Sequence, residues 1–146
     1  MTVVIDASLL VAVVSGDPRA DAVGARLAGW LASSEGLHAP ALTQFEVANG
    51  LTRLVAAGAM PEDRVAPAWQ AIQELPISYH PLRNGPLVVS LARRLERHSA
   101  YDAAYLTLAQ ELDGTCWTLD GRLVRNAARL ELPVKVLLLD NAVKFT

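Results

Sequence analysis

Residues 1–10, MTVVIDASLL, place one aspartate directly after a short apolar stretch and just before a second one. Val3, Val4 and Ile5 are consecutive and β-branched, which is typical of a strand covered on both faces within a parallel sheet. Asp6 falls where this strand is expected to end. Because ligands of open α/β sheets bind beyond the carboxyl ends of the strands, Asp6 is a candidate functional residue. The alternative is that Asp6 or Ser8 only caps the following helix.

Helical and extended patterns alternate along the rest of the chain. Hydrophobic spacing and turn residues predict helices over 8–14, 21–32, 41–57, 61–75, 87–97, 101–112 and 120–130, and strands over 3–5, 36–40, 77–80, 115–118 and 134–138. In the helix over 41–57, an apolar arc of Phe45, Ala48, Leu51 and Val55 is expected to face inward. This order predicts an α/β protein: a three-layer α/β/α sandwich with a central parallel sheet of four to five strands, in one domain over 1–146.

Composition narrows the class of protein. Hydrophobic residues make up 52% of the chain, so we expect a compact globule. The net charge of -2 gives no global attraction to nucleic acid, so a polyanion would need a local basic patch or metal ions. Cys116 is the only cysteine, which excludes an internal disulfide. No basic segment precedes the first apolar run, and the longest wholly apolar run is only Leu9–Val14, so we expect a cytoplasmic protein without membrane contact.

Four acidic residues stand beside apolar sequence: Asp6, Glu46, Asp102 and Asp120. Asp6 and Asp120 follow the first and fourth predicted strands. Right-handed crossovers bring the carboxyl ends of parallel strands to one edge, so these two carboxylates are expected at the same edge.

Each of the other acids also has a structural interpretation. Glu46 could be a solvated helix residue paired with Arg53. Asp102 could close a capping box that starts at Ser99, because residues 99–102 fit the pattern S-x-x-D. Asp120 could cap its own helix.

Carboxylates that lie close together repel one another unless a cation neutralises them, so a cluster of these acids predicts a metal site. Oxygen ligands suit Mg²⁺ or Mn²⁺, and four acids are enough for one or two ions. Two such ions can activate a water and stabilise an in-line phosphoryl displacement. No histidine base is then required, and His38, His80 and His98 show no metal-ligand spacing. His38 is expected to be a satisfied or edge residue of its strand.

Smaller polar residues accompany the acids. Ser8, Asn49 and Thr118 could orient a carboxylate or hydrogen-bond a metal-bound water, or they could be caps and core hydroxyls. Two groups of arginines adjoin the acids in sequence and are candidates for binding RNA phosphates, or are ordinary solvated helix faces: Arg93, Arg94 and Arg97, and Arg122, Arg125 and Arg129. Trp30, Trp69 and Trp117 occupy apolar positions and are assigned to packing.

Four segments, taken in order, resemble the PIN-domain family, and specifically the VapC toxins of bacterial toxin-antitoxin pairs. They are VVIDASLLVAVVSGDP (3–18), TQFEVANGL (43–51), SAYDAAYLTLAQ (99–110) and TCWTLDGRLVRNA (115–127). The resemblance implies an α/β/α sandwich, Mg²⁺- or Mn²⁺-dependent endoribonuclease activity on an RNA substrate, and a homodimer. It places the family's acids on Asp6, Glu46, Asp102 and Asp120, with Ser8, Asn49 and Thr118 in support. It also implies a cognate antitoxin, whose tail we expect across the acidic pocket with an arginine between the carboxylates.

Other functions remain open from the sequence. A phosphatase of the haloacid dehalogenase type would use Asp6 as nucleophile but needs a second acid at position 8, where this chain has a serine. A receiver domain would need an aspartate at the end of the third strand, which here ends Tyr79-His80-Pro81. A PIN-like binding module that has lost catalysis is the non-enzymatic alternative.

Overall fold

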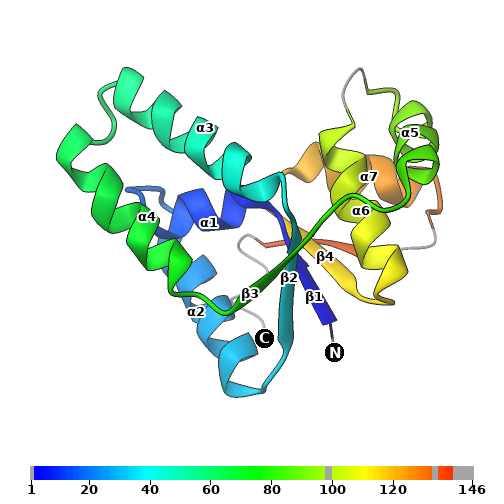
Figure 1. Cartoon of the computed structure of the whole chain (residues 1–146), viewed down its shortest axis with the longest axis horizontal. Helices are drawn as coiled ribbons and strands as arrows, with labels where there is room; N and C mark the ends of the chain where they lie inside the picture. Colours follow the sequence, from blue (N-terminus) through cyan, green and yellow to red (C-terminus); the bar gives the residue numbers. More distant parts are fainter. Residues whose placement is uncertain (1, 98–99, 133–134, 140–146) are drawn as a thin grey trace.

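Five parallel strands form one sheet with the order β3-β2-β1-β4-β5 in the computed structural model (Figure 1). The strands are β1 (Thr2–Ile5), β2 (Gly36–Pro40), β3 (Ile77–His80), β4 (Thr115–Thr118) and β5 (Lys135–Leu138). The structure describes residues 2–97, 100–132 and 135–139; Val134, expected to start the last strand, lies outside them. The chain leaves β1 toward β2 on one side and later returns to β4 on the other. The strand order thus reverses at β1, and in such sheets the crevice at this reversal is the usual ligand site.

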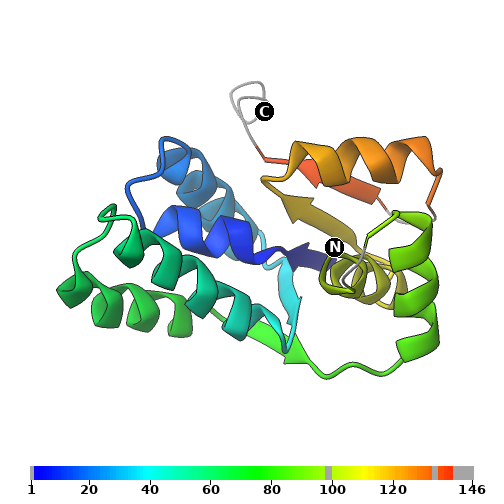
Figure 2. The same ribbon diagram turned by 90° about the horizontal axis from the view of Figure 1, so that it is seen from above.

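Helices connect all the strands. They are α1 (Ala7–Val13), α2 (Ala20–Ala32), α3 (Thr43–Ala56), α4 (Val65–Gln73), α5 (Gly85–Arg94), α6 (Tyr101–Glu111) and α7 (Gly121–Arg129), with a 3₁₀ turn at Glu62–Arg64. Seen from above, α1 to α4 lie on one side of the sheet and α5 to α7 on the other (Figure 2). The expected three-layer α/β/α architecture is therefore confirmed.

The first strand shows how the sequence produces these layers. Val3 and Ile5 pack into an apolar cluster with α1 and α2, whereas Val4 packs into a second cluster with α5, α6 and α7. All three side chains are at most 1% exposed. Successive side chains of a strand point to opposite faces, so an uninterrupted apolar run is what a sheet covered on both faces requires.

The inward face of α3 differs from the predicted arc. Phe45 is 77% exposed and Ala48 is also exposed, whereas Leu51 of the predicted arc and Val47 outside it are buried. They pack with α1 and α4 in a third cluster. The helix is apolar on more than one side, so its spacing allowed two inward faces, and contact with α1 selects between them. At this contact an added Cβ on Gly50 would lie 2.7 Å from Val11 Cγ2, so α1 and α3 approach too closely for any larger residue.

Two other helix limits differ from the prediction. Residues 61–75 were expected to form one helix, but they divide into the 3₁₀ turn and α4, which ends at Gln73. The helix predicted to end at Arg97 instead ends at Arg94, and Glu96 takes the left-handed conformation with φ 58°. Arg97 consequently leaves the helical face that carries Arg93 and Arg94.

The tryptophans expected to pack do so: Trp30 and Trp117 belong to the cluster with α1 and α2, and Trp69 packs partly buried against the third cluster. Trp30 and Trp117 meet edge to face with ring centroids 5.3 Å apart. In the described ranges no helix has the length and apolar character needed to cross a membrane.

Candidate functional site

Four helices begin at the carboxyl edge of the sheet, and each begins with or close to a carboxylate. Asp6 precedes α1 and Asp120 precedes α7, while Glu46 and Asp102 lie in the first turns of α3 and α6. A helix N-terminus carries a partial positive charge from its unpaired N–H groups, which favours nearby anions. The fold therefore offsets part of the repulsion among these acids with helix ends.

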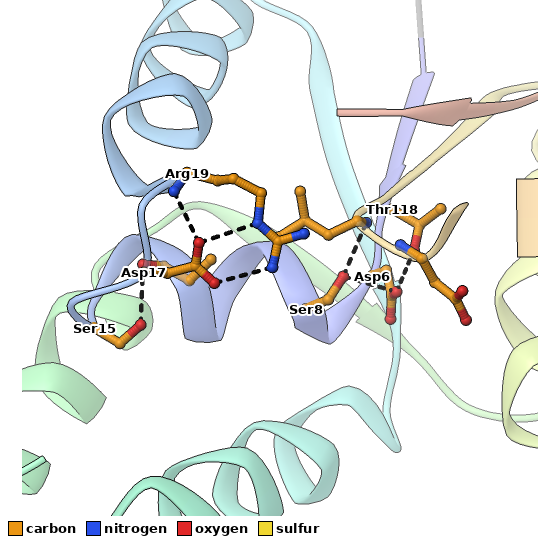
Figure 3. Close-up of polar contacts among 9 residues, drawn as sticks. Asp6, Ser8, Ser15, Asp17, Arg19 and Thr118 are labelled. Atoms are coloured by element: carbon orange, nitrogen blue, oxygen red, sulfur yellow. Dashed lines mark hydrogen bonds and ion pairs between the residues drawn. The ribbon is translucent and has the colours of Figure 1, made fainter. Parts of the chain in front are cut away.

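Asp6 lies deepest in this group and is held by two hydroxyls. Ser8 Oγ donates to Asp6 Oδ2 at 2.9 Å, and Thr118 Oγ1 donates to the same oxygen at 2.6 Å (Figure 3). The Asp6 backbone N–H bonds to the Trp117 carbonyl at 3.0 Å, which keeps the end of β1 beside β4. Burial raises the pKa of Asp6 above its ordinary 3.8, against the lowering effect of the two hydroxyls. Ser8 and Thr118 thus occupy the supporting positions expected for them.

Glu46 contacts a buried tyrosine and not a surface arginine. The Tyr105 hydroxyl donates a short hydrogen bond to Glu46 Oε1, and Thr43 Oγ1 donates to the Tyr105 oxygen at 3.0 Å. Burial raises the pKa of Glu46, and the negative charges of Asp6 and Asp102 raise it further. The alternative of a solvated Glu46 paired with Arg53 describes this arrangement only in part: Glu46 is half-buried and hydrogen-bonds the phenol, while the charge of Arg53 lowers its pKa.

Asp102 and Asp120 share the guanidinium of Arg97. Arg97 Nε lies 3.5 Å from Asp102 Oδ2, and Arg97 Nη2 lies 3.9 Å from Asp120 Oδ2. Burial raises the pKa of Asp102; the charge of Arg97 lowers it, while those of Asp6 and Asp120 raise it. Arg97, expected on a phosphate-binding helix face with Arg93 and Arg94, is directed into the acidic cluster instead.

Asp120 also caps its own helix, which was the structural alternative for this residue. Its Oδ1 accepts hydrogen bonds from the backbone N–H groups of Arg122 and Leu123, at 3.0 and 3.3 Å, and so caps α7. The other oxygen remains directed toward Arg97, so capping and membership of the cluster coexist. The proposed capping box for Asp102 needs Ser99, which lies outside the described residues.

The structure therefore brings the four predicted acids together. The charges of Asp6, Glu46 and Asp102 act on one another, and that of Asp120 acts on Asp102. Among the residues that the structure describes, however, no three His, Cys, Asp or Glu side chains are arranged to hold one metal ion. The four acids form an acidic cluster in which Arg97 supplies positive charge beside Asp102 and Asp120.

The other candidates are exposed helix residues or, in the case of His38, a strand residue. Asn49 is exposed on α3, one turn beyond Glu46. Arg93, Arg94, Arg122, Arg125 and Arg129 are exposed on α5 and α7, and Arg94 Nη2 donates to the Leu130 carbonyl at 3.2 Å. His38 Nδ1 lies 2.8 Å from His80 Nε2 across β2 and β3, so His38 is a satisfied strand residue as expected.

Tyr105 and Thr43 were missed by the sequence reasoning. A signal was present: Tyr105 is the only residue with a ring hydroxyl inside the apolar run 103–109, and a buried phenol requires a hydrogen-bond partner. Its spacing of three residues after Asp102 places it on the same helix face.

A five-stranded parallel α/β/α sandwich with clustered acids at its strand-order reversal defines the class of protein. Comparison with known proteins identifies the family. The PIN domain model matches residues 3–129, and the chain belongs to the PIN-domain family.

Individual relatives extend this assignment. Ribonuclease VapC3 of Mycobacterium tuberculosis is 33% identical over 124 residues, which cover 84% of this chain and 85% of that protein. Ribonuclease VapC9 of the same organism is 30% identical over 138 residues, covering 92% and 97%. The crystal structure of PAE2754 from Pyrobaculum aerophilum shares the fold, with a TM-score of 0.70 at 17% identity over 99% of this chain and 88% of that one.

Proposed function

We propose that this protein is a metal-dependent endoribonuclease, a VapC-like toxin that hydrolyses RNA phosphodiester bonds. The observation that carries the proposal is the convergence of Asp6, Glu46, Asp102 and Asp120 at the carboxyl edge beside β1 and β4. Membership of the PIN-domain family and relatives named as ribonucleases support it.

The donor set suits Mg²⁺ or Mn²⁺. All four side chains offer oxygen ligands. Burial raises the pKa values of Asp6, Glu46 and Asp102, and neighbouring carboxylates raise those of Glu46 and Asp102 further, so a bound cation would favour the ionised forms. Asp6, Glu46, Asp102 and Asp120 would hold one or two ions after a change of side-chain conformation, because no three acids of the described residues surround one point in the structure. Bound there, such ions would supply Lewis-acid stabilisation and an activated water for phosphodiester hydrolysis.

The protein's own residues would position the reactants. Ser8 and Thr118 fix the orientation of the Asp6 carboxylate. The helix N-termini of α1, α3, α6 and α7 converge where the negative charge of a scissile phosphate must be accommodated. Exposed arginines on α5 and α7 are candidates for the flanking RNA phosphates.

The partners follow from the same site. We expect a cognate antitoxin whose tail covers the acidic pocket and inserts an arginine between the carboxylates. Arg97 already demonstrates that a guanidinium can lie beside Asp102 and Asp120. A homodimer is expected from the family. A complex in which every one of the four acids stayed open to solvent would contradict the proposed mode of inhibition.

The test is RNA cleavage in Mg²⁺, in Mn²⁺ and with chelator, using wild-type protein and Asp6→Asn. The variant keeps the shape of the side chain but removes its charge, and we expect at least about 100-fold slower cleavage because several kcal/mol of transition-state stabilisation depend on the bound ions. Asp113→Asn is the matched control, because Asp113 is exposed beyond the opposite end of α6 from Asp102 and has a φ of 51° that asparagine tolerates.

Other results would identify the alternatives. Cleavage at the wild-type rate by Asp6→Asn would refute the site assignment. Binding of a partner without any metal-dependent turnover would indicate a binding module. Turnover of a phosphate monoester but not of RNA would indicate a phosphatase, although Ser8 stands where that mechanism needs its second acid.

A further inference from the structure

The buried pair Tyr105 and Thr43 belongs to the acidic site although neither residue is acidic. Tyr105 is 1% exposed and Thr43 is fully buried, and their side-chain hydrogen bonds run from Thr43 to Tyr105 to Glu46. Tyr105 and Thr43 are closed to bulk water, whereas Glu46 is half-buried. The Glu46 oxygen that accepts from the phenol is therefore oriented by a protein group.

The direction of the hydrogen bonds is fixed by their chemistry. An ionised carboxylate only accepts, so the Tyr105 hydroxyl must donate to Glu46. The single proton of the phenol is then used, so Thr43 must donate to the Tyr105 oxygen. Burial, and next the charge of Asp6, raise the pKa of Tyr105 far above its ordinary value, so the phenol keeps its proton.

Thr43, Tyr105 and Glu46 form a hydrogen-bonded bridge between two helices. Thr43 and Glu46 are three residues apart on α3, and Asp102 and Tyr105 are three residues apart on α6. Residues at this spacing share one helix face. Helix α6 thus carries one carboxylate itself and holds the carboxylate of α3 through the phenol, although the two helices are far apart in the chain.

We propose that Tyr105, supported by Thr43, is a positioning residue that fixes Glu46 for divalent-ion binding by linking α3 to α6. The inference rests on the proposed metal-dependent function. With Oε1 held by the phenol, Glu46 presents its other oxygen to the ion. Groups that orient metal ligands in this way typically change metal affinity by about 10- to 100-fold when removed.

The experiment measures Mn²⁺ binding directly, by calorimetry or by the electron paramagnetic resonance signal of free Mn²⁺, with the melting temperature in chelator as a second readout. Tyr105→Phe keeps the buried ring and removes only the hydroxyl, and we expect its Kd for Mn²⁺ to rise about 10- to 100-fold. Tyr79→Phe is the control, because Tyr79 is a partly buried tyrosine on the edge strand β3 and should leave the Kd unchanged.

A double-mutant cycle separates positioning from a general structural effect. If the phenol acts through Glu46, Tyr105→Phe should no longer change the Mn²⁺ affinity when Glu46→Gln is already present. Thr43→Val should weaken binding less than Tyr105→Phe, and Thr43→Ser, which keeps the hydroxyl, should bind as the wild type does.

Three outcomes would overturn the inference. One is that Tyr105→Phe binds Mn²⁺ as tightly as the wild type while Glu46→Gln binds it more weakly. This result would refute the positioning role but not the proposed metal-dependent function. Another is that Tyr105→Phe lowers the Mn²⁺ affinity equally with and without Glu46→Gln, which would show a general structural effect of the substitution. If wild type binds no Mn²⁺, both this inference and the metal-dependent function fail.

Should Tyr105→Phe show no melting transition, Thr43→Val takes its place in the test. Unchanged Mn²⁺ affinity in Thr43→Val would then contradict the proposal.

Discussion

Arg97 Nε lies 3.5 Å from Asp102 Oδ2, and neither Nε nor Nη2 of this guanidinium makes a hydrogen bond within the described residues. The arginine therefore contributes charge more than directed bonding. In the metal-free pocket this positive charge offsets the acids, but it opposes any divalent ion that binds beside it.

Replacing Arg97 should consequently have opposite effects on metal binding and on metal-free stability. We expect Arg97→Gln to tighten the Kd for Mn²⁺ by up to about tenfold, which corresponds to about 1.4 kcal/mol. In chelator its melting temperature should fall. Arg93→Gln, an exposed change on α5, is the control and should alter neither quantity. Weaker Mn²⁺ binding in Arg97→Gln would show that the guanidinium supports the ion and does not compete with it.

Asp6 predicts a pH dependence of stability with a definite sign. Its pKa is raised in the folded protein by burial. Such a carboxyl holds its proton more tightly when folded, so its stabilising contribution is complete below the unfolded pKa of about 4 and is lost as the pH rises through the folded pKa. Asp6→Asn does not titrate. Its advantage in unfolding free energy over wild type, measured by denaturant titration in chelator, should grow as the pH rises from about 4 and level off above the folded pKa.

The same measurement in saturating Mn²⁺ should reverse the order. Ions bind the ionised carboxylate, so they stabilise the wild type more than Asp6→Asn. If the advantage in unfolding free energy of Asp6→Asn in chelator shrinks as the pH rises, the raised pKa of Asp6 is contradicted.

Thr118 connects two of the acids through one hydroxyl. Its Oγ1 donates to Asp6 and accepts the backbone N–H of Asp120 at 3.0 Å, and the residue is fully buried. Thr118→Val keeps the volume but leaves these groups without their partner, so we expect a loss of about 1–3 kcal/mol in unfolding free energy and slower RNA cleavage. Thr118→Ser should retain most of both. If Thr118→Val and Thr118→Ser have the same unfolding free energy and cleavage rate, the hydroxyl is not responsible for the effect.

Gly50 offers a test of the contact that places α3 on α1. Because an added Cβ would lie 2.7 Å from Val11 Cγ2, Gly50→Ala should push the helices apart and cost about 1–3 kcal/mol. Gly29→Ala provides the matched comparison: it lies within α2 with nothing within 4 Å of an added Cβ and should stabilise the protein by about 0.5–1 kcal/mol. Thermal unfolding of both variants checks this contrast, and a Gly50→Ala protein as stable as wild type would refute it.

The position of Asp6 and Asp120 at the carboxyl edge of the sheet could be predicted because it depends on local sequence patterns. Val3 to Ile5 form an unbroken apolar strand that ends in Asp6, and parallel pairing then brings Asp6 and Asp120 to one edge whatever the details of packing. Ser8 and Thr118 lie two residues from these acids, so their place in the site was also within reach of the sequence.

Contacts between helices could not be predicted in the same way. Whether Phe45 is buried or exposed depends on which side of α3 meets α1. Spacing alone assigned Phe45 to the buried side, whereas its side chain is exposed. Arg97 enters the pocket because α5 ends three residues before it, a limit that no proline or glycine marks in the sequence. The bond from Tyr105 to Glu46 depends on how α3 and α6 cross, which no local pattern encodes.

The hydrogen bond from Thr118 to Asp6 joins residues 112 positions apart, and Asp120 follows two residues later. During synthesis Asp6 therefore leaves the ribosome long before Thr118 and Asp120. Any chemistry that needs all four acids is absent from the nascent chain until α7 has emerged.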